Sequence, residues 1–257
     1  MRKITVIIKL IILVLLLSFF VSVLLRGFVP FGIVNDNHSW SSVPILTNGR
    51  STENATLISG LMSLPSDNID RFVIDSVSGN IDVRLADNDE ITVEYSGGDV
   101  DCYYQQTGNT LYVFIEWDNQ WFTFNSTRKE GNITVYIPKD LQHSMTINAV
   151  SSPMSLFAYG DGCSIDTVSG SVDIYAGYRT ITCDTVSGNL VVRHIEEYPT
   201  TLIDFDTVSG DMILQGDFIY DLDFESLSGK IRDTNGQTSG AALRISADSV
   251  SGNFSRQ

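Results

Sequence analysis

The sequence is poor in the residues that carry most catalytic and metal-binding chemistry. Its 257 residues include three histidines and three cysteines. An odd number of cysteines argues against a disulfide framework, and the spacing of Cys102, Cys163 and Cys183 matches no zinc site. We therefore expect free thiols, no metal, no cofactor and no catalytic residues.

Basic residues are also scarce. The chain has 16 Lys and Arg against 31 Asp and Glu, which gives a formal net charge of −15. Four basic residues lie in the first 26 positions, so the rest of the chain has 12 basic and 31 acidic residues and a formal charge of −19. This charge argues against nucleic acid as a partner, and it also serves to keep a sheet protein soluble.

Long apolar runs are missing except at the N-terminus. Ile4–Leu25 is a 22-residue apolar run interrupted by Lys9 and small hydroxyl side chains, and about 20 residues suffice to cross a bilayer. Arg2 and Lys3 before it favour a cytoplasmic N-terminus. We expect residues 1–26 to form an uncleaved transmembrane signal-anchor. The alternative is a cleaved signal peptide, whose apolar region would be shorter.

The segment after this run, residues 27–68, has no sustained periodicity. It contains Pro30, Pro44 and Pro65 together with several Ser and Asn, a composition typical of an irregular linker. Within it, Leu57–Leu64 is compatible with a short helix or a capping strand. We interpret residues 27–68 as a stalk between the cell membrane and an extracytoplasmic domain at residues 69–257.

The domain is dominated by one repeated phrase, Asp-Thr-Val-Ser-Gly. The copies, some with one to three changes, are Asp75–Gly79, Asp166–Gly170, Asp184–Gly188, Asp206–Gly210, Glu225–Gly229, Asp248–Gly252 and a degraded copy at Asn148–Ser152. We call the last residue of each copy its corner residue. Positions seven and five residues before the corner residue, and two and four after it, are mostly apolar, as at Cys163, Ile165, Val172 and Ile174 around Gly170.

Each repeat therefore predicts a strand, a bend and a second strand. The apolar positions have a period of two on either side of the phrase, which indicates strands with one buried face. From Ser152 onward the corner residues are 18 to 23 residues apart, and units of this length can stack into a shared core. We predict an all-β, β-solenoid-like stack of two-strand coils. We expect Val168, Val186 and Val208 to point into its corners and Gly to supply backbone freedom.

A long insertion separates the first repeat from the second. It contains five strand-like runs and a tight turn at Thr107–Asn109, which predict an antiparallel hairpin region covering one end of the stack. Its aromatic residues, notably Trp117, Trp121 and Phe122, form our candidate partner surface. The alternative is that these rings pair across strands and hold the hairpin together.

The acid that begins each phrase predicts an outward file of carboxylates. Neighbouring members of this file would stand about 4.8 Å apart. We expect each carboxylate to accept a hydrogen bond from its own bend; a cation-binding ladder is the alternative. Since the acids recur in every coil, no pair of them stands out as an acid and base.

The final copy, Asp248–Gly252, is followed by only five residues. We expect it to form the exposed end of the stack and to fray first. Arg256 occupies a position where the repeat would place an inward apolar residue. A charge at that position would discourage association, so we expect the soluble domain to be a monomer.

The repeated units, the segment Ile69–Val83 and the Val-x-Ile-Pro type run at Ile133–Pro138 resemble the bacterial putative-adhesin family of β-strand repeat proteins. The resemblance covers roughly Ile69–Gln257 and implies an envelope-exposed solenoid without catalytic residues. It suggests a membrane-anchored surface interaction, adhesion or scaffold module with a protein, cell-wall or glycan partner. The alternatives are an accessory of envelope-stress signalling that binds a membrane sensor and a glycan-active enzyme.

Overall fold

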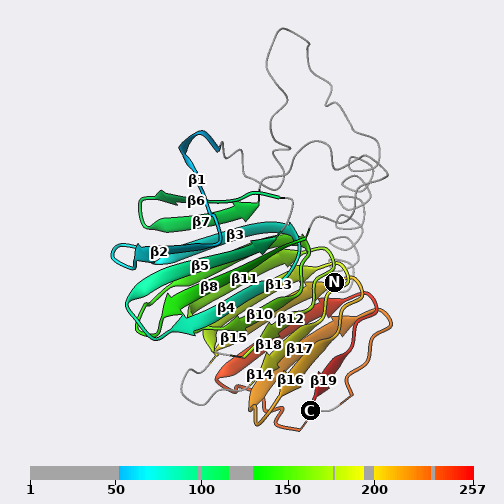
Figure 1. Ribbon diagram of the computed structural model, residues 1–257. Coiled ribbons are helices and arrows are strands. Elements are labelled where there is room, and N and C mark those ends of the chain that lie inside the picture. The colour runs from blue at the N-terminus through cyan, green and yellow to red at the C-terminus, as the bar shows by residue number, and fades with distance from the viewer. Residues whose placement is uncertain (1–51, 98–99, 116–129, 176, 194–199, 233–234) are drawn as a thin grey trace, which may run out of the picture. The chain divides into compact units, whose positions relative to one another are not determined.

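The computed structural model describes residues 52–97, 100–115, 130–175, 177–193, 200–232 and 235–257. After a short 3-10 helix at Thr52–Asn54, these residues form strands only (Figure 1). The first eight strands are β1 (Thr56–Leu57), β2 (Leu61–Pro65), β3 (Arg71–Ser78), β4 (Ile81–Ala86), β5 (Glu90–Gly97), β6 (Cys102–Thr107), β7 (Thr110–Ile115) and β8 (Gly131–Pro138). The rest are β9 (Ser144–Ser151), β10 (Met154–Phe157), β11 (Gly160–Thr167), β12 (Val172–Ile174), β13 (Tyr178–Thr185), β14 (Leu190–Arg193), β15 (Leu202–Thr207), β16 (Met212–Gln215), β17 (Tyr220–Ser226), β18 (Leu243–Ser249) and β19 (Phe254–Arg256).

The strands form two sheets that share one hydrophobic core. The ten-stranded sheet has the order β1-β6-β7-β3-β9-β11-β13-β15-β18-β17, and the nine-stranded sheet has the order β19-β16-β14-β12-β10-β4-β8-β5-β2. Each repeat contributes one strand to the ten-stranded sheet, and every repeat except Glu225–Gly229 also contributes one to the nine-stranded sheet; neighbouring repeats pair in parallel. The prediction of an all-β stack of two-strand coils is therefore confirmed.

Inward side chains of successive coils lie in register. One file in the ten-stranded sheet runs through Leu111, Phe72, Met145, Cys163, Ile181, Ile203, Ile245 and Leu222. All of these except Leu222 are buried. The predicted alignment of Cys163 with Ile181 is confirmed, and all three cysteines are free and buried. Burial raises the pKa of Cys163 to about 12, so this thiol stays protonated and packs as a small apolar side chain.

The second residue of the repeated phrase closes the bend in five of the copies. The hydroxyl of Thr185 accepts a hydrogen bond of 2.9 Å from the backbone N–H of Gly188, and Thr207 does the same for Gly210 at 2.8 Å. These threonines are buried, whereas Val186 and Val208 are only half-buried. The expectation that the valines fill the corners is thus wrong. The inward alternation continues from the strand onto Thr, so Val comes after the last inward position.

The serine of the phrase joins one coil to the next. The backbone N–H of Ser187 donates to the carbonyl of Val168 at 3.0 Å, and its hydroxyl donates to the same oxygen at 3.3 Å. Ser209 repeats both bonds to Val186. The bends therefore stack through their backbones.

The glycines are required because the stacked bends approach closely. A Cβ added to Gly188 or Gly210 would lie less than 3.0 Å from the carbonyl oxygen of the preceding corner residue. Among the described corner glycines, only Gly79 has a positive φ, of 99°. Space, and not backbone freedom, thus explains glycine at the other corners.

The last two coils are not stacked in sequence order. Strand β18 pairs with β15 on one side and with β17 on the other, so β17 forms the edge of the sheet. The colours of Figure 1 allow this inversion to be followed. The expectation that Asp248–Gly252 ends this sheet is wrong. The Glu225–Gly229 coil lies outermost instead.

Packing in the second inward file accounts for the inversion. In this file, Phe205 of β15 is followed by Ala247 of β18 and then by Phe224 of β17. Stacking in sequence order would place the two phenylalanine rings on neighbouring strands at the same inward position. The small Ala247 between them lets large and small side chains alternate.

Antiparallel strands cover the N-terminal end of both sheets. Strands β6 and β7 form a hairpin whose turn contains Gly108, with φ 61°, and β5 pairs antiparallel with β8. Strands β1 and β2, inside the segment interpreted as a linker, extend this region by pairing with β6 and β5. The predicted anchor at Ile4–Leu25 lies outside the described residues. None of the described residues forms a helix long and apolar enough to cross a membrane.

Candidate binding face on the nine-stranded sheet

The aromatic residues proposed from the sequence, Trp117, Trp121 and Phe122, lie outside the described residues. The rings next to them in β6 and β7 are described. Phe114 is buried and stacks on Tyr103 of the neighbouring strand, with ring centroids 5.9 Å apart. This pair supports the hairpin as cross-strand packing does.

The repeated acids form the expected outward file. Asp166 pairs in register with Asp184, which pairs with Asp206, and the file continues to Asp248 and Glu225. The pKa of Asp166 is raised overall, because the effect of burial exceeds the lowering caused by a hydrogen bond with the Asp184 carboxyl. Burial and the Asp166 charge raise the pKa of Asp184. The described residues contain no group of three side chains placed to hold a metal ion.

A hydrogen bond that closes the bend is made by the threonine that follows the acid, as at Thr185 and Thr207. At the first coil, the Asp75 carboxylate accepts a hydrogen bond of 2.7 Å from the Asn148 amide. This bond connects two neighbouring coils, since Asp75 and Asn148 are in register. The repeated phrase thus has a structural role. Its threonine closes the bend, its serine joins the bend to the next one, and its glycine allows the two bends to approach closely.

A different set of side chains gathers on the outer face of the nine-stranded sheet. Four of these residues each lie five positions after a corner residue. The fifth is a tyrosine of β8 that is in register with the first of the four. We call this set the aromatic–arginine strip; in spatial order it contains Tyr136, Arg84, Phe157, Tyr175 and Arg193.

The centre of the strip is a three-layer stack. The rings of Phe157 and Tyr175 are 4.2 Å apart and nearly parallel, at 8°. The guanidinium of Arg193 lies over the Tyr175 ring at 4.5 Å, within the range of a cation–π interaction. Asp173 lies 3.6 Å from this guanidinium, and the Nε atom of Arg193 is buried without a hydrogen-bond partner in the described structure.

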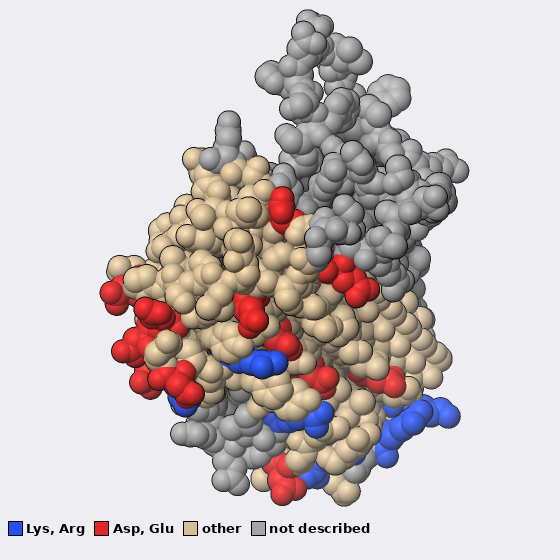
Figure 2. Space-filling view, viewed as in Figure 1, with Lys and Arg blue, Asp and Glu red and all other residues tan. Residues whose placement is uncertain are grey.

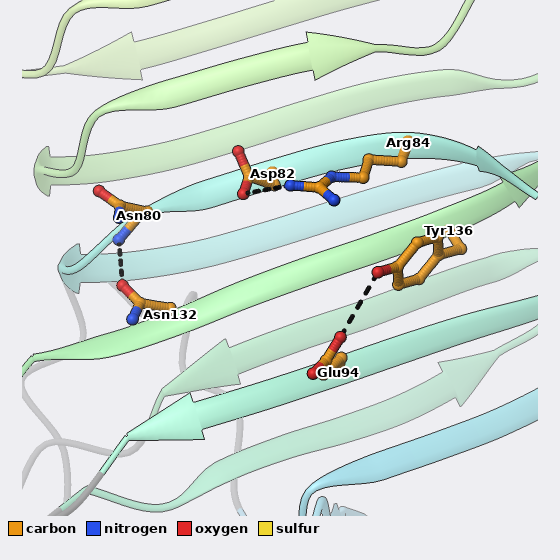
Figure 3. Close-up of polar contacts among 6 residues, drawn as sticks. All are labelled: Asn80, Asp82, Arg84, Glu94, Asn132 and Tyr136. Atoms are coloured by element: carbon orange, nitrogen blue, oxygen red, sulfur yellow. Dashed lines mark hydrogen bonds and ion pairs between the residues drawn. The ribbon is translucent and has the colours of Figure 1, made fainter.

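The other part of the strip is polar. Arg84 contacts Asp82 of its own strand at 3.3 Å, and the Tyr136 hydroxyl donates to Glu94 at 3.4 Å (Figure 3). At the start of the same strands, the N–H of Asn80 donates to the Asn132 side chain at 2.8 Å. Both arginines thus face a carboxylate, and the strip together with Asp82 and Asp173 has no formal net charge although the protein is acidic.

The strip offers binding chemistry. Phe157 keeps 40% of its surface exposed, while both faces of Tyr175 are covered by Phe157 and Arg193. A ligand would therefore meet ring edges, one phenylalanine and guanidinium donors. The sequence carries the signal for this set, because the residue five places after each corner alternates onto the outer face. We did not predict this set from the sequence, because we considered aromatic residues as a partner surface only in the insertion.

The described part of the chain also includes His143, which lies between β8 and β9. Its imidazole is buried between Phe72 and Tyr178, with edge-to-face ring geometry on both sides. Its Nδ1 atom is 3.0 Å from the Leu141 carbonyl oxygen. Burial lowers the pKa of His143, so it is a neutral core residue at pH 7. On the face shown in Figure 2, acidic side chains gather at the left edge and are otherwise scattered, while the basic ones lie in the middle and lower part.

A solved structure shares this fold at very low sequence identity. A "putative cell adhesion protein" from Clostridium sporogenes ATCC 15579 matches with a TM-score of 0.52 and 6% identity, over 79% of this chain and all of that one. A "putative adhesin" from Bacteroides fragilis NCTC 9343 has a TM-score of 0.41 and 9% identity, over 79% of this chain and 97% of that one. No curated protein matches the sequence. A family model matches residues 69–256, nearly the whole stack of coils, and the chain therefore belongs to the Toastrack DUF4097 family.

Proposed function

We propose that the protein is a membrane-anchored, extracytoplasmic interaction module that binds a surface or cell-wall polymer through its nine-stranded sheet. The observation that carries this proposal is a division of labour within each coil. Residues of the repeated phrase are used in closing a bend, as Thr185 is, or in joining it to the next coil, as Ser187 is. The outward residues of the aromatic–arginine strip differ from coil to coil, which is what selective binding requires.

Three further observations support a non-catalytic role. The structural neighbours are named as adhesion proteins, the acids of β11, β13 and β15 recur at equivalent register positions, and His143 is a core residue. Acid–base chemistry needs two groups in unlike environments at one cleft. Support for the anchor comes from the apolar run Ile4–Leu25 and the basic residues around it.

A retention assay with the full chain in detergent micelles tests binding. Purified peptidoglycan, acidic polysaccharides and isolated membranes serve as the panel. We expect retention on a wall or polysaccharide member, and about tenfold weaker retention for Phe157→Ala combined with Tyr175→Ala, because the exposed stack is lost. The matched control is Ser164→Ala with Thr182→Ala, at outward positions of the other sheet.

Two results would contradict the proposal. Equal retention of both double variants would place binding elsewhere, and release of new reducing ends from a polysaccharide would indicate an enzyme. Retention on membranes alone would favour a membrane partner. The anchor is tested separately, since the intact chain should sediment with membranes after a high-salt wash; a soluble chain starting near Phe28 would show cleavage.

A further inference from the structure

The two sheets end differently at the C-terminal side of the stack. In the nine-stranded sheet, the segment beyond β19 is bonded to it, because the Phe254 N–H donates to Lys230 and the Arg232 N–H donates to Phe254. In the ten-stranded sheet, no described strand follows β17. Among the described residues, the segment around Gln237 covers β17 at Tyr220 through backbone hydrogen bonds and at Asp221 through the Gly240 N–H.

In the described structure, the outward side of β17 beyond Tyr220 therefore has backbone N–H and C=O groups available for pairing with another strand. The N–H of Tyr220 donates to Gly236 and its carbonyl accepts from Thr238, so both groups point away from β18. Backbone groups of successive residues in a strand point to opposite sides. Those of Leu222 and Phe224 consequently point to the same open side as those of Tyr220. An edge of this kind is a template for a further strand.

The side chains at this edge are equally incomplete. Leu222 and Phe224 occupy the inward files, yet they are only half-buried, whereas Ile245 and Ala247 one strand away are buried. Near them, Ile219 is 69% and Leu227 60% exposed. Another strand would cover the two half-buried side chains.

Charge excludes the simplest occupant, a second copy of this edge. The outward residues of β17 are Asp221, Asp223 and Glu225. Asp221 accepts a hydrogen bond from the Gly240 N–H, which leaves Asp223 and Glu225 facing whatever lies alongside. Two β17 strands paired about a two-fold axis would set these acids against each other, and like charges opposed across strands are destabilising.

The other end of the same chain offers no better match. Strands β1 and β2 are the edges there, and neither contains Lys or Arg. A head-to-tail copy would thus bring no positive charge to Asp223 and Glu225. The occupant that fits must combine an extended backbone with charges of the opposite sign.

We propose that the open edge of β17 is a docking site for an extended segment of a different protein in which basic and apolar residues alternate. The segment adds a strand to the ten-stranded sheet. Its apolar side chains cover Leu222 and Phe224, and its Lys or Arg side chains lie beside Asp223 and Glu225. This is recognition by strand addition, where the backbone supplies affinity and alternate side chains supply specificity. It is independent of the aromatic–arginine strip.

Fluorescence anisotropy with a labelled peptide of alternating Lys and Val tests this proposal on the full chain in detergent micelles. The informative variant is Leu222→Pro, which removes an N–H on the open side and leaves the ladder with β18 intact. Leu222→Ala is its matched control, because it also shortens the side chain but keeps the N–H. We expect Leu222→Pro to bind at least tenfold more weakly than Leu222→Ala.

A charge reversal gives a second, independent readout. Asp223→Lys with Glu225→Lys should lose the Lys–Val peptide and gain a peptide of alternating Glu and Val. Equal binding by the proline and alanine variants would overturn the proposal, as would equal binding of both peptides by the native chain. Light scattering that shows native dimers dissociated by Leu222→Pro would also overturn it, because the occupant would then be a second copy.

Discussion

The two ends of the stack differ in how completely their last inward side chains are covered. At the N-terminal end, the inward files finish at Leu111 and Val113, which are fully buried because β6 and β1 continue the sheet beyond them. At the C-terminal end, the same files finish at Leu222 and Phe224, which are half-buried. A repeat protein needs caps, and here only the end with local antiparallel hairpins has a full one. Both ends expose some apolar edge residues, such as Leu57 and Ile219.

The largest effect should come from crowding the column of corner glycines. Gly210→Ala places a Cβ against the carbonyl of Gly188, and we expect the free energy of unfolding to fall by about 3 kcal/mol or more. Gly229→Ala creates a similar contact with Gly252, but the outermost coil can move away, so the loss should be less than half as large. Urea denaturation measures both.

Gly162→Ala is the control for this comparison, because the added Cβ would meet its nearest neighbour, Thr180, at 3.7 Å. Its stability should be close to that of the native protein. Equal losses for Gly210→Ala and Gly229→Ala would mean that the outer coil is held as firmly as the inner ones.

A smaller effect separates the two ends directly. Leu111→Ala should lower the free energy of unfolding by about 3 kcal/mol, as expected when a buried leucine is truncated. Leu222→Ala, in the same inward file, should cost about 1 kcal/mol, because water already reaches this side chain. Urea midpoints of the two variants decide it, and an equal cost would show that the C-terminal end is covered.

Removing one hydroxyl from a bend should cost about 2 kcal/mol. Thr185→Val keeps the shape of the side chain but leaves the buried Gly188 N–H without its acceptor. Thr185→Ser should be close to native, and Ser226→Ala in the open coil should cost less than Thr185→Val, since Ser226 is half-buried. Hydrogen exchange at the Gly188 amide provides the site-specific measurement. Unchanged exchange in Thr185→Val would contradict this role of the hydroxyl.

The smallest effect concerns pH. The folded protein lowers the pKa of His143, so below about pH 6.5 the unfolded chain binds a proton that the folded protein does not. The contribution of His143 is therefore full above this pH and is lost as pH falls. We expect about 1 kcal/mol less stability at pH 5.5 than at pH 7.5.

His143→Gln should remove most of this pH dependence. Hydrogen exchange at pH 5.5 should show β9 and its neighbours opening before β15 and β18, because His143 precedes β9 and is the one histidine among the described residues. An unchanged slope of stability against pH in His143→Gln would assign the effect to other groups.

The sequence allowed the coils and their inward files to be predicted, because a period of two on each side of a repeated bend permits one register. It did not allow the order of the last two coils to be predicted. The Glu225 and Asp248 copies have the same pattern, so either can follow β15. The distinguishing signal is volume: Phe205 and Phe224 need Ala247 between them, and this appears only when the repeats are aligned as stacked layers.

The binding faces were harder to predict for another physical reason. The alternation that places apolar residues inward does not restrict aromatic and basic side chains on an outer face. Whether such side chains form a binding site depends on which strands become neighbours. Tyr136 meets Arg84 only because β8 pairs with β4, across the long insertion. The reading of Arg256 shows the same limit. It occupies an inward register opposite Leu214, yet its side chain binds the Gly216 carbonyl and Asp217.

The inverted order of the last coils has a consequence for biosynthesis. A chain delivered from its N-terminus presents β17 before β18, although β18 is the only strand of the described residues with which β17 forms a ladder. Until residues 243–249 arrive, the edge of β15 and the whole of β17 are exposed together. Premature pairing of these two strands would trap two phenylalanines on one another. Correct folding of the domain therefore depends on the insertion of β18 between β15 and β17. A chain that ends after β17 would allow β17 to pair wrongly with β15.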